Sequence, residues 1–524
     1  MRSAPLRTSA LAVALSCIGR LAAGQTPAAP AAGAPPPPAA EVPPPPAALP
    51  PAPPPAPMDH AMPAPPSAPA TLSTLGATPP PAPAAPSPVT TKFGAQFYGF
   101  VEFDGSWDST QSFSDLAGNA NIARDGTYAA GHGRTIFSAR NSRLGFKLKG
   151  PETQTVKTSG IVEGDFLGNQ PAGAPTPVAG GAGGVTVSES SFFTSPTFRM
   201  RHFALRVETP YIDVLAGQYW QLFGWQSMFH PNTVELQGVP GQIYSRSPQF
   251  RVSHAFKNDD MTLEIALAAS RPPQRNSEVP DGQAGIRFVL NNFKALHTAG
   301  GTGTAVDGAS IGLSTVGRYL RMPEFAAAPK NTVNINGYGY SADLLLPIIP
   351  AKNLTDGNAL TLTASFVYGQ AIADLYTGLS GGATVGTLPS TATGSYPQDI
   401  DNGLVGFVTN ADGTVSLHAI RWESYIIGAQ YYFPTPKRLW LSANVSHMYS
   451  PDIHNLETPA ATPGGAPGGA NKLWNRSYWA DANLFVDLNP AVRFGLEYAY
   501  FWQKYLDQTK GSNTRVQFSA FYIF

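Results

Sequence analysis

The C-terminal stretch Arg515-Val-Gln-Phe-Ser-Ala-Phe-Tyr-Ile-Phe524 decides the fold class of this chain. Apolar and aromatic side chains occupy every second position from Val516 to Phe524, and the first of them alternate with Arg515, Gln517 and Ser519. A period of two residues indicates a β-strand with one apolar and one polar face. The stretch therefore predicts a strand, and its length suits a strand that crosses a membrane at a tilt.

The same alternation recurs along residues 93–524. About sixteen strands are expected, over 96–107, 134–149, 155–167, 196–208, 210–219, 246–256, 260–271, 282–291, 308–320, 334–348, 358–370, 416–433, 437–450, 476–488, 491–504 and 513–524. A soluble β-sandwich would give the same alternation. The strand lengths, the alternation of short with long connections and the terminal aromatic residue favour a membrane barrel instead. We therefore predict an all-β fold, a transmembrane antiparallel up-and-down β-barrel.

The composition of the 524 residues limits the other classes of protein. Charged residues make up only 13%, and 34 Lys+Arg balance 34 Asp+Glu, which excludes a nucleic-acid binder that works by bulk basicity. The sequence contains no run of 18 apolar residues, so it predicts no transmembrane helix. The single cysteine, Cys17, excludes a disulfide scaffold and a Cys-based zinc site, so we expect no metal and no cofactor.

The first 92 residues divide into two segments. Residues 1–24 read as a Sec signal peptide, because Arg2 and Arg7 precede a short apolar run and small residues follow it. A lipoprotein signal with Cys17 as the lipidated residue is the alternative. Residues 25–92 hold 26 of the 52 prolines and favour extended polyproline II. We predict a Pro/Ala-rich periplasmic linker, which either reaches toward peptidoglycan or has no partner.

Charged side chains fall on the polar faces of the expected strands, where they would line a water-filled lumen. The candidate pore-lining residues are Arg143, Lys147, Glu163, Asp165, Arg199, Arg201, Arg251 and Arg287. A ladder of arginines would attract anions, since charged rings set pore selectivity. The alternative is that the arginines pair with the carboxylates and only stiffen the wall. Past Arg201 the alternation breaks, which predicts a β-bulge.

Residues 220–245 are rich in aromatic side chains and nearly free of charge. The candidate constriction residues are Trp220, Phe223, Trp225, His230 and Glu235, the last being the one ionised residue of the stretch. An external loop in water seldom carries so many aromatic residues. We expect the loop to fold inward and narrow the channel; packing against a neighbouring barrel is the alternative. His230 either contacts solute or is an ordinary hydrogen-bonded histidine.

Several runs, taken in order, carry a resemblance to a known family. They are Asn-Ser-Arg-Leu-Gly-Phe at 141–146, Val-Glu-Gly-Asp-Phe-Leu-Gly at 162–168, Arg-Met-Arg-His at 199–202, Leu-Ala-Gly-Gln-Tyr-Trp at 215–220 and Val-Pro-Gly-Gln-Ile-Tyr-Ser-Arg-Ser-Pro-Gln-Phe-Arg at 239–251. Residues 96–256 resemble the Gram-negative outer-membrane porin superfamily, most of all the DcaP-like porins. The resemblance implies a sixteen-stranded trimer associated with dicarboxylate uptake, in which Arg143, Arg199, Arg201 and Arg251 attract anions. The Pro/Ala segment departs from the family's heptad-like helical segment, which weakens the inference of a trimer.

We therefore predict a porin in the outer membrane of a Gram-negative bacterium, through which small hydrophilic solutes diffuse, with anions such as dicarboxylates favoured. The expected partners are outer-membrane lipid, two further copies in a homotrimer, and the barrel-assembly machinery, whose recognition signal the terminal Phe524 resembles. A substrate-specific or structural barrel tethered toward the cell wall, an adhesin and a soluble secreted β-protein are alternatives. An outer-membrane hydrolase would need a nucleophile, a base and an orienting group on one wall. No such motif occurs, and we do not expect an enzyme.

Overall fold

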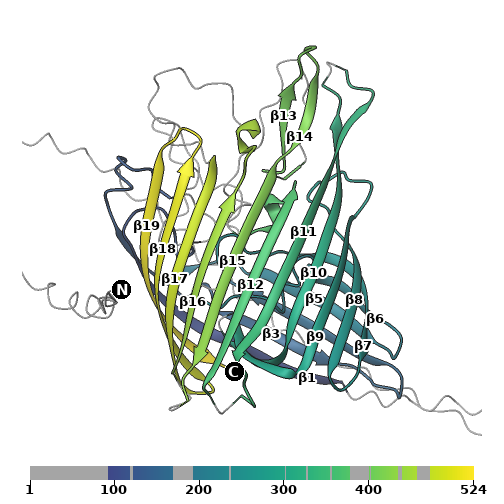
Figure 1. The fold of residues 1–524 in the computed structure, drawn as a ribbon, viewed down its shortest axis with the longest axis vertical. Coiled ribbons are helices and arrows are strands. Elements are labelled where there is room, and N and C mark those ends of the chain that lie inside the picture. The colour runs from purple at the N-terminus through teal and green to yellow at the C-terminus, as the bar shows by residue number, and fades with distance from the viewer. Residues whose placement is uncertain are drawn as a thin grey trace, which may run out of the picture. The chain divides into compact units, whose positions relative to one another are not determined.

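The structure is a computed structural model in which the main sheet closes into an antiparallel barrel of sixteen strand positions (Figure 1). The described residues are 93–117, 122–168, 193–234, 238–300, 302–325, 328–354, 357–377, 400–401, 403–434, 439–456 and 473–524. Within them, no helix is long and apolar enough to cross a bilayer. The predicted fold class is confirmed.

The strands follow one another around the barrel in chain order. They are β1 (Gly94–Asp108), β2 (Arg134–Ser138), β3 (Arg143–Lys149), β4 (Lys157–Asp165), β5 (Arg199–Glu208), β6 (Asp213–Trp220), β7 (Arg246–Lys257), β8 (Met261–Ser270), β9 (Asp281–Ala299), β10 (Gly303–Pro323), β11 (Thr332–Ile349), β12 (Ala359–Gln370), β13 (Val405–Thr409), β14 (Val415–Ala419), β15 (Arg421–Tyr432), β16 (Leu439–Tyr449), β17 (Trp474–Asn489), β18 (Val492–Tyr505) and β19 (Lys510–Ile523). Two short 3-10 helices, η1 (Ala373–Leu375) and η2 (Ile453–Leu456), lie in the connections. β2 and β3 both pair with β1 and together fill one position, which leaves sixteen positions in the barrel.

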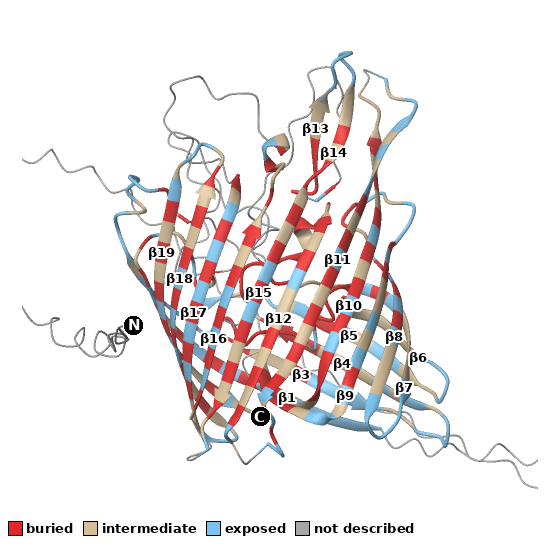
Figure 2. Cartoon of the chain, in the orientation of Figure 1, coloured by how far each residue is buried: buried red, intermediate tan, exposed pale blue. Residues whose placement is uncertain are grey.

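Most strands, β15–β19 most clearly, alternate between a covered inner face and an exposed outer face, visible as alternating bands in Figure 2. On β1, Glu102 and Asp104 are buried, whereas Val101 and Phe103, which alternate with them, are 53% and 44% exposed. An apolar, exposed outer face is what a lipid environment requires, while polar residues turn toward the lumen. Closure of the sheet leaves no free edge in that environment.

The end of the last strand closes the barrel. The Phe524 N–H donates to the Gly99 carbonyl oxygen at 3.1 Å, and the Gly99 N–H donates to the Phe524 carbonyl oxygen at 3.0 Å. The Phe524 ring stacks on Phe97, 4.9 Å between centroids, and Phe97 in turn contacts Phe146. The alternating C-terminal stretch therefore completes the sheet between β1 and β18.

Four strand spans differ from the sequence-based prediction. The span 134–149 is interrupted between β2 and β3, and 416–433 is two strands, because β14 pairs with β13 in a separate hairpin above the rim (Figure 1). The predicted spans 282–291 and 308–320 were too short. β9 continues to Ala299 and β10 begins at Gly303, so both strands extend past the ends of their neighbours.

The two ends of the barrel differ in their connections. β1 begins, and β19 ends, at the end that also carries the short turns, such as the one between β17 and β18. The long connections, including the one between β6 and β7, lie at the other end. Porin-type barrels have short periplasmic turns and long external loops. We therefore call the two ends periplasmic and external.

Candidate functional site

The described parts of the connection between β6 and β7, residues 221–234 and 238–245, lie inside the barrel and are called the inner loop from here on. The Phe223 N–H donates to Gln283 Oε1 of β9 at 2.9 Å, and the Gly224 N–H donates to Ser314 Oγ of β10 at 2.7 Å. On the opposite wall, the Val234 N–H donates to Asn483 Oδ1 of β17 at 2.9 Å. The loop is thus held from walls that face each other across the lumen.

Glycines in the barrel wall form the seat for the aromatic side chains of the inner loop. Trp225 Nε1 donates to the Leu313 carbonyl oxygen at 3.1 Å. A Cβ atom at Gly312 would lie 2.7 Å from Trp225 and 2.8 Å from Phe229, and one at Gly285 would lie 2.8 Å from Trp225. Trp225 itself has a φ of 43°, a left-handed conformation that is costly for a bulky residue and persists only where surroundings enforce it. The contacts with β9 and β10 hold Trp225 in this conformation.

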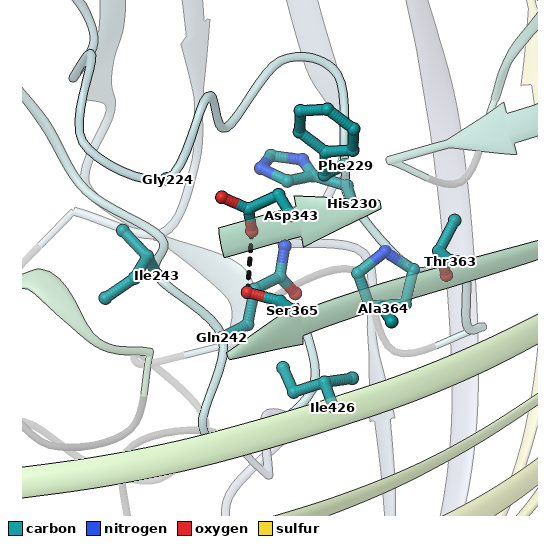
Figure 3. Close-up of a pocket in the computed structure, with 11 residues that line it drawn as sticks. Gly224, Phe229, His230, Gln242, Ile243, Asp343, Thr363, Ala364, Ser365 and Ile426 are labelled. Carbon is teal, nitrogen blue, oxygen red and sulfur yellow. Dashed lines mark hydrogen bonds between the residues drawn. The ribbon is translucent and has the colours of Figure 1, made fainter. Parts of the chain in front are cut away.

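The inner loop closes tightly against β11, β12 and β15. Figure 3 shows His230, Gln242 and Ile243 of the loop facing Asp343 and Ser365 across a cavity of only about 10 Å³. This is about the volume that holds one water, so no solute passes there. The Asp343 carboxylate accepts hydrogen bonds from Ser341 Oγ at 2.6 Å and Ser365 Oγ at 2.7 Å. The inner loop therefore fills the lumen in front of β11, β12 and β15, and this part of the lumen is called the filled side from here on.

The opposite side of the lumen contains a charged cavity of about 470 Å³ along the inner faces of β5–β10. Its charged lining residues are Arg206, Asp213, Arg251, Lys257, Glu264, Arg287, Lys294 and Asp307. Five cations thus face three carboxylates. A second cavity of about 350 Å³ shares Arg206, Asp213 and Lys257 with the first and extends to the periplasmic turns at Gln154 and Pro210.

A network of arginines and carboxylates lies on the inner faces of β3, β4 and β5. Asp165 accepts two hydrogen bonds from the Arg199 guanidinium, at 2.9 and 2.6 Å, and one from Arg201 Nη1 at 3.1 Å. Glu163 Oε1 accepts from Arg201 Nε at 2.7 Å and lies 3.8 Å from Arg143 Nε. Three guanidinium groups therefore share two carboxylates, so the network keeps one excess positive charge.

A β-bulge builds this network, at the position where the alternation of the sequence breaks. Opposite β4, Met200 pairs with Gly164 and His202 pairs with Glu163, which leaves Arg201 as the extra residue. Arg201 and His202 are consecutive yet both buried on the inner side, while Met200 and Phe203 are exposed on the outer side. The bulge therefore places the Arg201 guanidinium and the His202 imidazole side by side next to Glu163.

An aromatic group at the root of the inner loop contacts these arginines. Arg246 lies over the rings of Trp220 and Tyr244, at 4.7 and 5.4 Å, and the Trp220 ring packs edge-on against His230 and Tyr244. Burial alone would raise the pKa of Tyr244, but the guanidinium groups of Arg201, Arg246 and Arg143 lower it to about 8. Burial and the charges of Arg246 and Arg201 lower the pKa of His230 to about 3, so this histidine is neutral at physiological pH. Both shifts report a positive field at the loop root.

The remaining predicted pore residues lie apart from that network. Arg287 pairs with Glu264 at 2.8 Å, and Lys147 lies 4.9 Å from the Tyr98 ring centroid. Arg251 donates to the Trp220 carbonyl oxygen at 2.5 Å and to Gln249 Oε1, and it forms no ion pair within the described residues. Glu235 lies outside the described residues.

Three charged residues of the lumen were not among the residues predicted from the sequence. Arg246 was read as part of a family-like run, and only the folded loop brings it over Trp220. Lys294 and Asp307 lie on parts of β9 and β10 that were expected to be turns. Within the part of the chain that the structure describes, no group of three or more His, Cys, Asp or Glu side chains is arranged to hold a metal ion.

The closed sixteen-position barrel, with one loop folded into a charged lumen, has the fold of the outer-membrane porins. Among solved structures, the chain is similar to the outer membrane channel DcaP of Acinetobacter baumannii, at 16% identity and a TM-score of 0.53, over 82% of this chain and 97% of that one. It is also similar to an anion-selective porin from Comamonas acidovorans, at 9% identity and a TM-score of 0.43, over 83% and 100% of the two chains. No protein-family model and no curated protein matches the chain. At these identities the likeness to DcaP shows the fold alone, so selectivity has to be argued from this chain's own side chains.

Proposed function

We propose that the protein is an outer-membrane porin that gives small hydrophilic solutes a water-filled passage and favours anions. The observation that carries the proposal is the cavity along β5–β10, in which five cations face three carboxylates while the other side of the lumen is filled. A passage lined by one sign of charge concentrates ions of the opposite sign. The neutral total charge of the chain is no obstacle, because the excess is local to this wall.

The arginines divide by role in this proposal. Arg199 and Arg201 form ion pairs with carboxylates and mainly stiffen the barrel wall. Arg251, Lys257 and Lys294 form no ion pair within the described residues and supply the attraction for anions. Guanidinium groups match carboxylate and phosphate oxygens in geometry, so small carboxylates suit this wall. The proposal therefore assigns the paired wall and the selective ladder, the two interpretations of the sequence, to different arginines.

The proposal includes the rest of the chain as the sequence describes it. Residues 1–24 direct export, residues 25–92 form the periplasmic linker, and Phe524 serves recognition by the barrel-assembly machinery. Assembly as a homotrimer follows from the resemblance to the porin superfamily.

The test is conductance of the purified protein in a planar bilayer. The proposal predicts stepwise insertion of open channels. A protein that inserts, as judged by protease protection in liposomes, and yet passes no current contradicts it.

A further inference from the structure

The periplasmic ends of β9 and β10 leave the barrel wall. β8 pairs with β9 only as far as Leu290, and β11 pairs with β10 only from Ser310 onward. Beyond these points β9 and β10 pair solely with each other, through Gly303, and the register shifts between Gly308 and Ala309. Residues 291–300 and 302–309 therefore form a two-stranded ribbon, called the inner hairpin from here on.

One face of the inner hairpin is bonded to the inner faces of β12 and β15. The Thr298 N–H donates to Gln430 Oε1 at 2.8 Å, and Gln430 Nε2 donates back to the Thr298 carbonyl oxygen at 2.9 Å. Thr361 Oγ1 donates to the Leu296 carbonyl oxygen at 2.8 Å. Gln430 and Thr361 are inward-facing residues of β15 and β12. Farther along the ribbon, Thr304 Oγ1 accepts a hydrogen bond from Arg493 Nη2 of β18 at 3.4 Å, so the hairpin extends along the wall from β12 to β18.

The inner hairpin also packs against the inner loop. Leu296 is 2% exposed and belongs to one apolar cluster with Val234 of the inner loop and Trp440 and Phe485 of the wall. The bend that turns the hairpin inward requires a residue without a side chain, because a Cβ at Gly308 would lie 2.5 Å from the Leu290 carbonyl oxygen. The two inserted segments, one from each end of the barrel, meet in the lumen.

The other face of the inner hairpin lines the charged cavity. Lys294, Val306 and Asp307 contribute to its wall, opposite Arg251 and Lys257 of β7. The hairpin is thus a partition between the open side of the lumen and the filled side. Across the ribbon, His297 Nε2 and Asp307 Oδ2 lie 2.8 Å apart.

We propose that the inner hairpin is a second constriction, at the periplasmic mouth, that confines the exit of solutes to the cavity along β5–β10 and presents Lys294 to them. This inference rests on the proposed porin function and adds an exit filter to it. An anion that has passed the loop root meets Lys294 before it leaves. The residue would therefore act on the conductance and on the preference for anions.

The first test replaces residues 292–308 by an Asn-Gly turn, which joins the two strands at the barrel wall. Single-channel conductance should rise about twofold, because the partition at the mouth is gone. A folded variant with the conductance of the wild type overturns the inference. A wild-type protein that passes no current overturns the proposed function instead, so the two failures are distinguishable.

The second test needs no deletion. Lys294→Cys is compared with Lys352→Cys, an exposed residue of the β11–β12 turn at the same end of the barrel, both in a Cys17→Ser background. A negatively charged thiol reagent should lower the anion current through the first variant by about a third or more and leave the second unchanged. Equal responses of the two variants, or none in Lys294→Cys with labelling verified by mass, overturn the inference.

Discussion

The charged side chains on the two sides of the lumen are stabilised in different ways. Along β3–β10, arginines outnumber carboxylates, and the space in front of β5–β10 is open. Along β11–β18, the inner loop and the inner hairpin cover the wall. There the Asp343 carboxylate is held by two serine hydroxyls, and Asp481 is held by Asn444, Asn483 and Trp479.

This difference follows from solvation. A covered carboxylate without a cation must be satisfied by neutral hydrogen-bond donors, since no water reaches it. An open wall tolerates excess positive charge, since water and passing anions solvate it. The side that is filled is therefore held by hydrogen bonds, and the side that is charged is the side through which solutes would pass.

The largest expected effect separates the two kinds of carboxylate. Glu163→Ala leaves the buried Arg201 without its main partner and should lower the free energy of unfolding by about 3–5 kcal/mol. Asp343→Asn keeps an acceptor for the serine hydroxyls and should cost about 1 kcal/mol. Urea unfolding of the detergent-solubilised protein, followed by tryptophan fluorescence, measures both. Equal losses would remove the distinction between the walls.

The next effect concerns the covering of the filled side. Gly312→Phe places a ring where Trp225 and Phe229 sit, so the inner loop should leave its seat and the single-channel conductance should rise about twofold. Gly317→Phe is the matched control, because Gly317 lies on the exposed outer face of the same strand with open space beside it. The comparison fails if both variants conduct like the wild type while the Gly312 variant is correctly folded.

The smallest effect concerns pH. Because the pKa of Tyr244 is lowered to about 8, its phenol ionises as the pH rises from 7 to 9 and adds a negative charge at the loop root. The preference for anions should therefore fall by up to about twofold over this range. Tyr244→Phe should remove the change. Reversal potentials at pH 7 and pH 9 measure this change in anion preference. If Tyr244→Phe shows the same change as the wild type, another group titrates.

The outer face and the closure of the barrel could be predicted from the sequence, because both depend on a local period of two. The sixteen positions are confirmed, and the break after Arg201 is a bulge that the sequence already indicates. These features need only neighbours along one strand. The apolar stretch ending at Phe524 is the clearest case, since its partners on β1 follow from barrel closure.

The lumen could be predicted only in part, because its contacts join residues far apart in the chain. The inner-loop residue Trp225 is seated by glycines of β9 and β10, which nothing in the loop sequence indicates. The sequence predicts this strand only to residue 291, whereas β9 continues to Ala299 and Thr298 finds its hydrogen bonds on β15. The partners of Arg246 likewise appear only once the loop has folded inward.

The most direct test of the central claim is the reversal potential across a planar bilayer in a potassium chloride gradient, for the wild type and for Arg251→Glu. Arg251 lines the open cavity and pairs with no carboxylate in the described part of the chain, so its replacement reverses one charge in the passage without leaving a carboxylate unpaired. We predict an anion-selective potential for the wild type and a potential closer to zero, or of opposite sign, for Arg251→Glu. A cation-selective wild type, or a variant with the same potential as the wild type, would contradict the account.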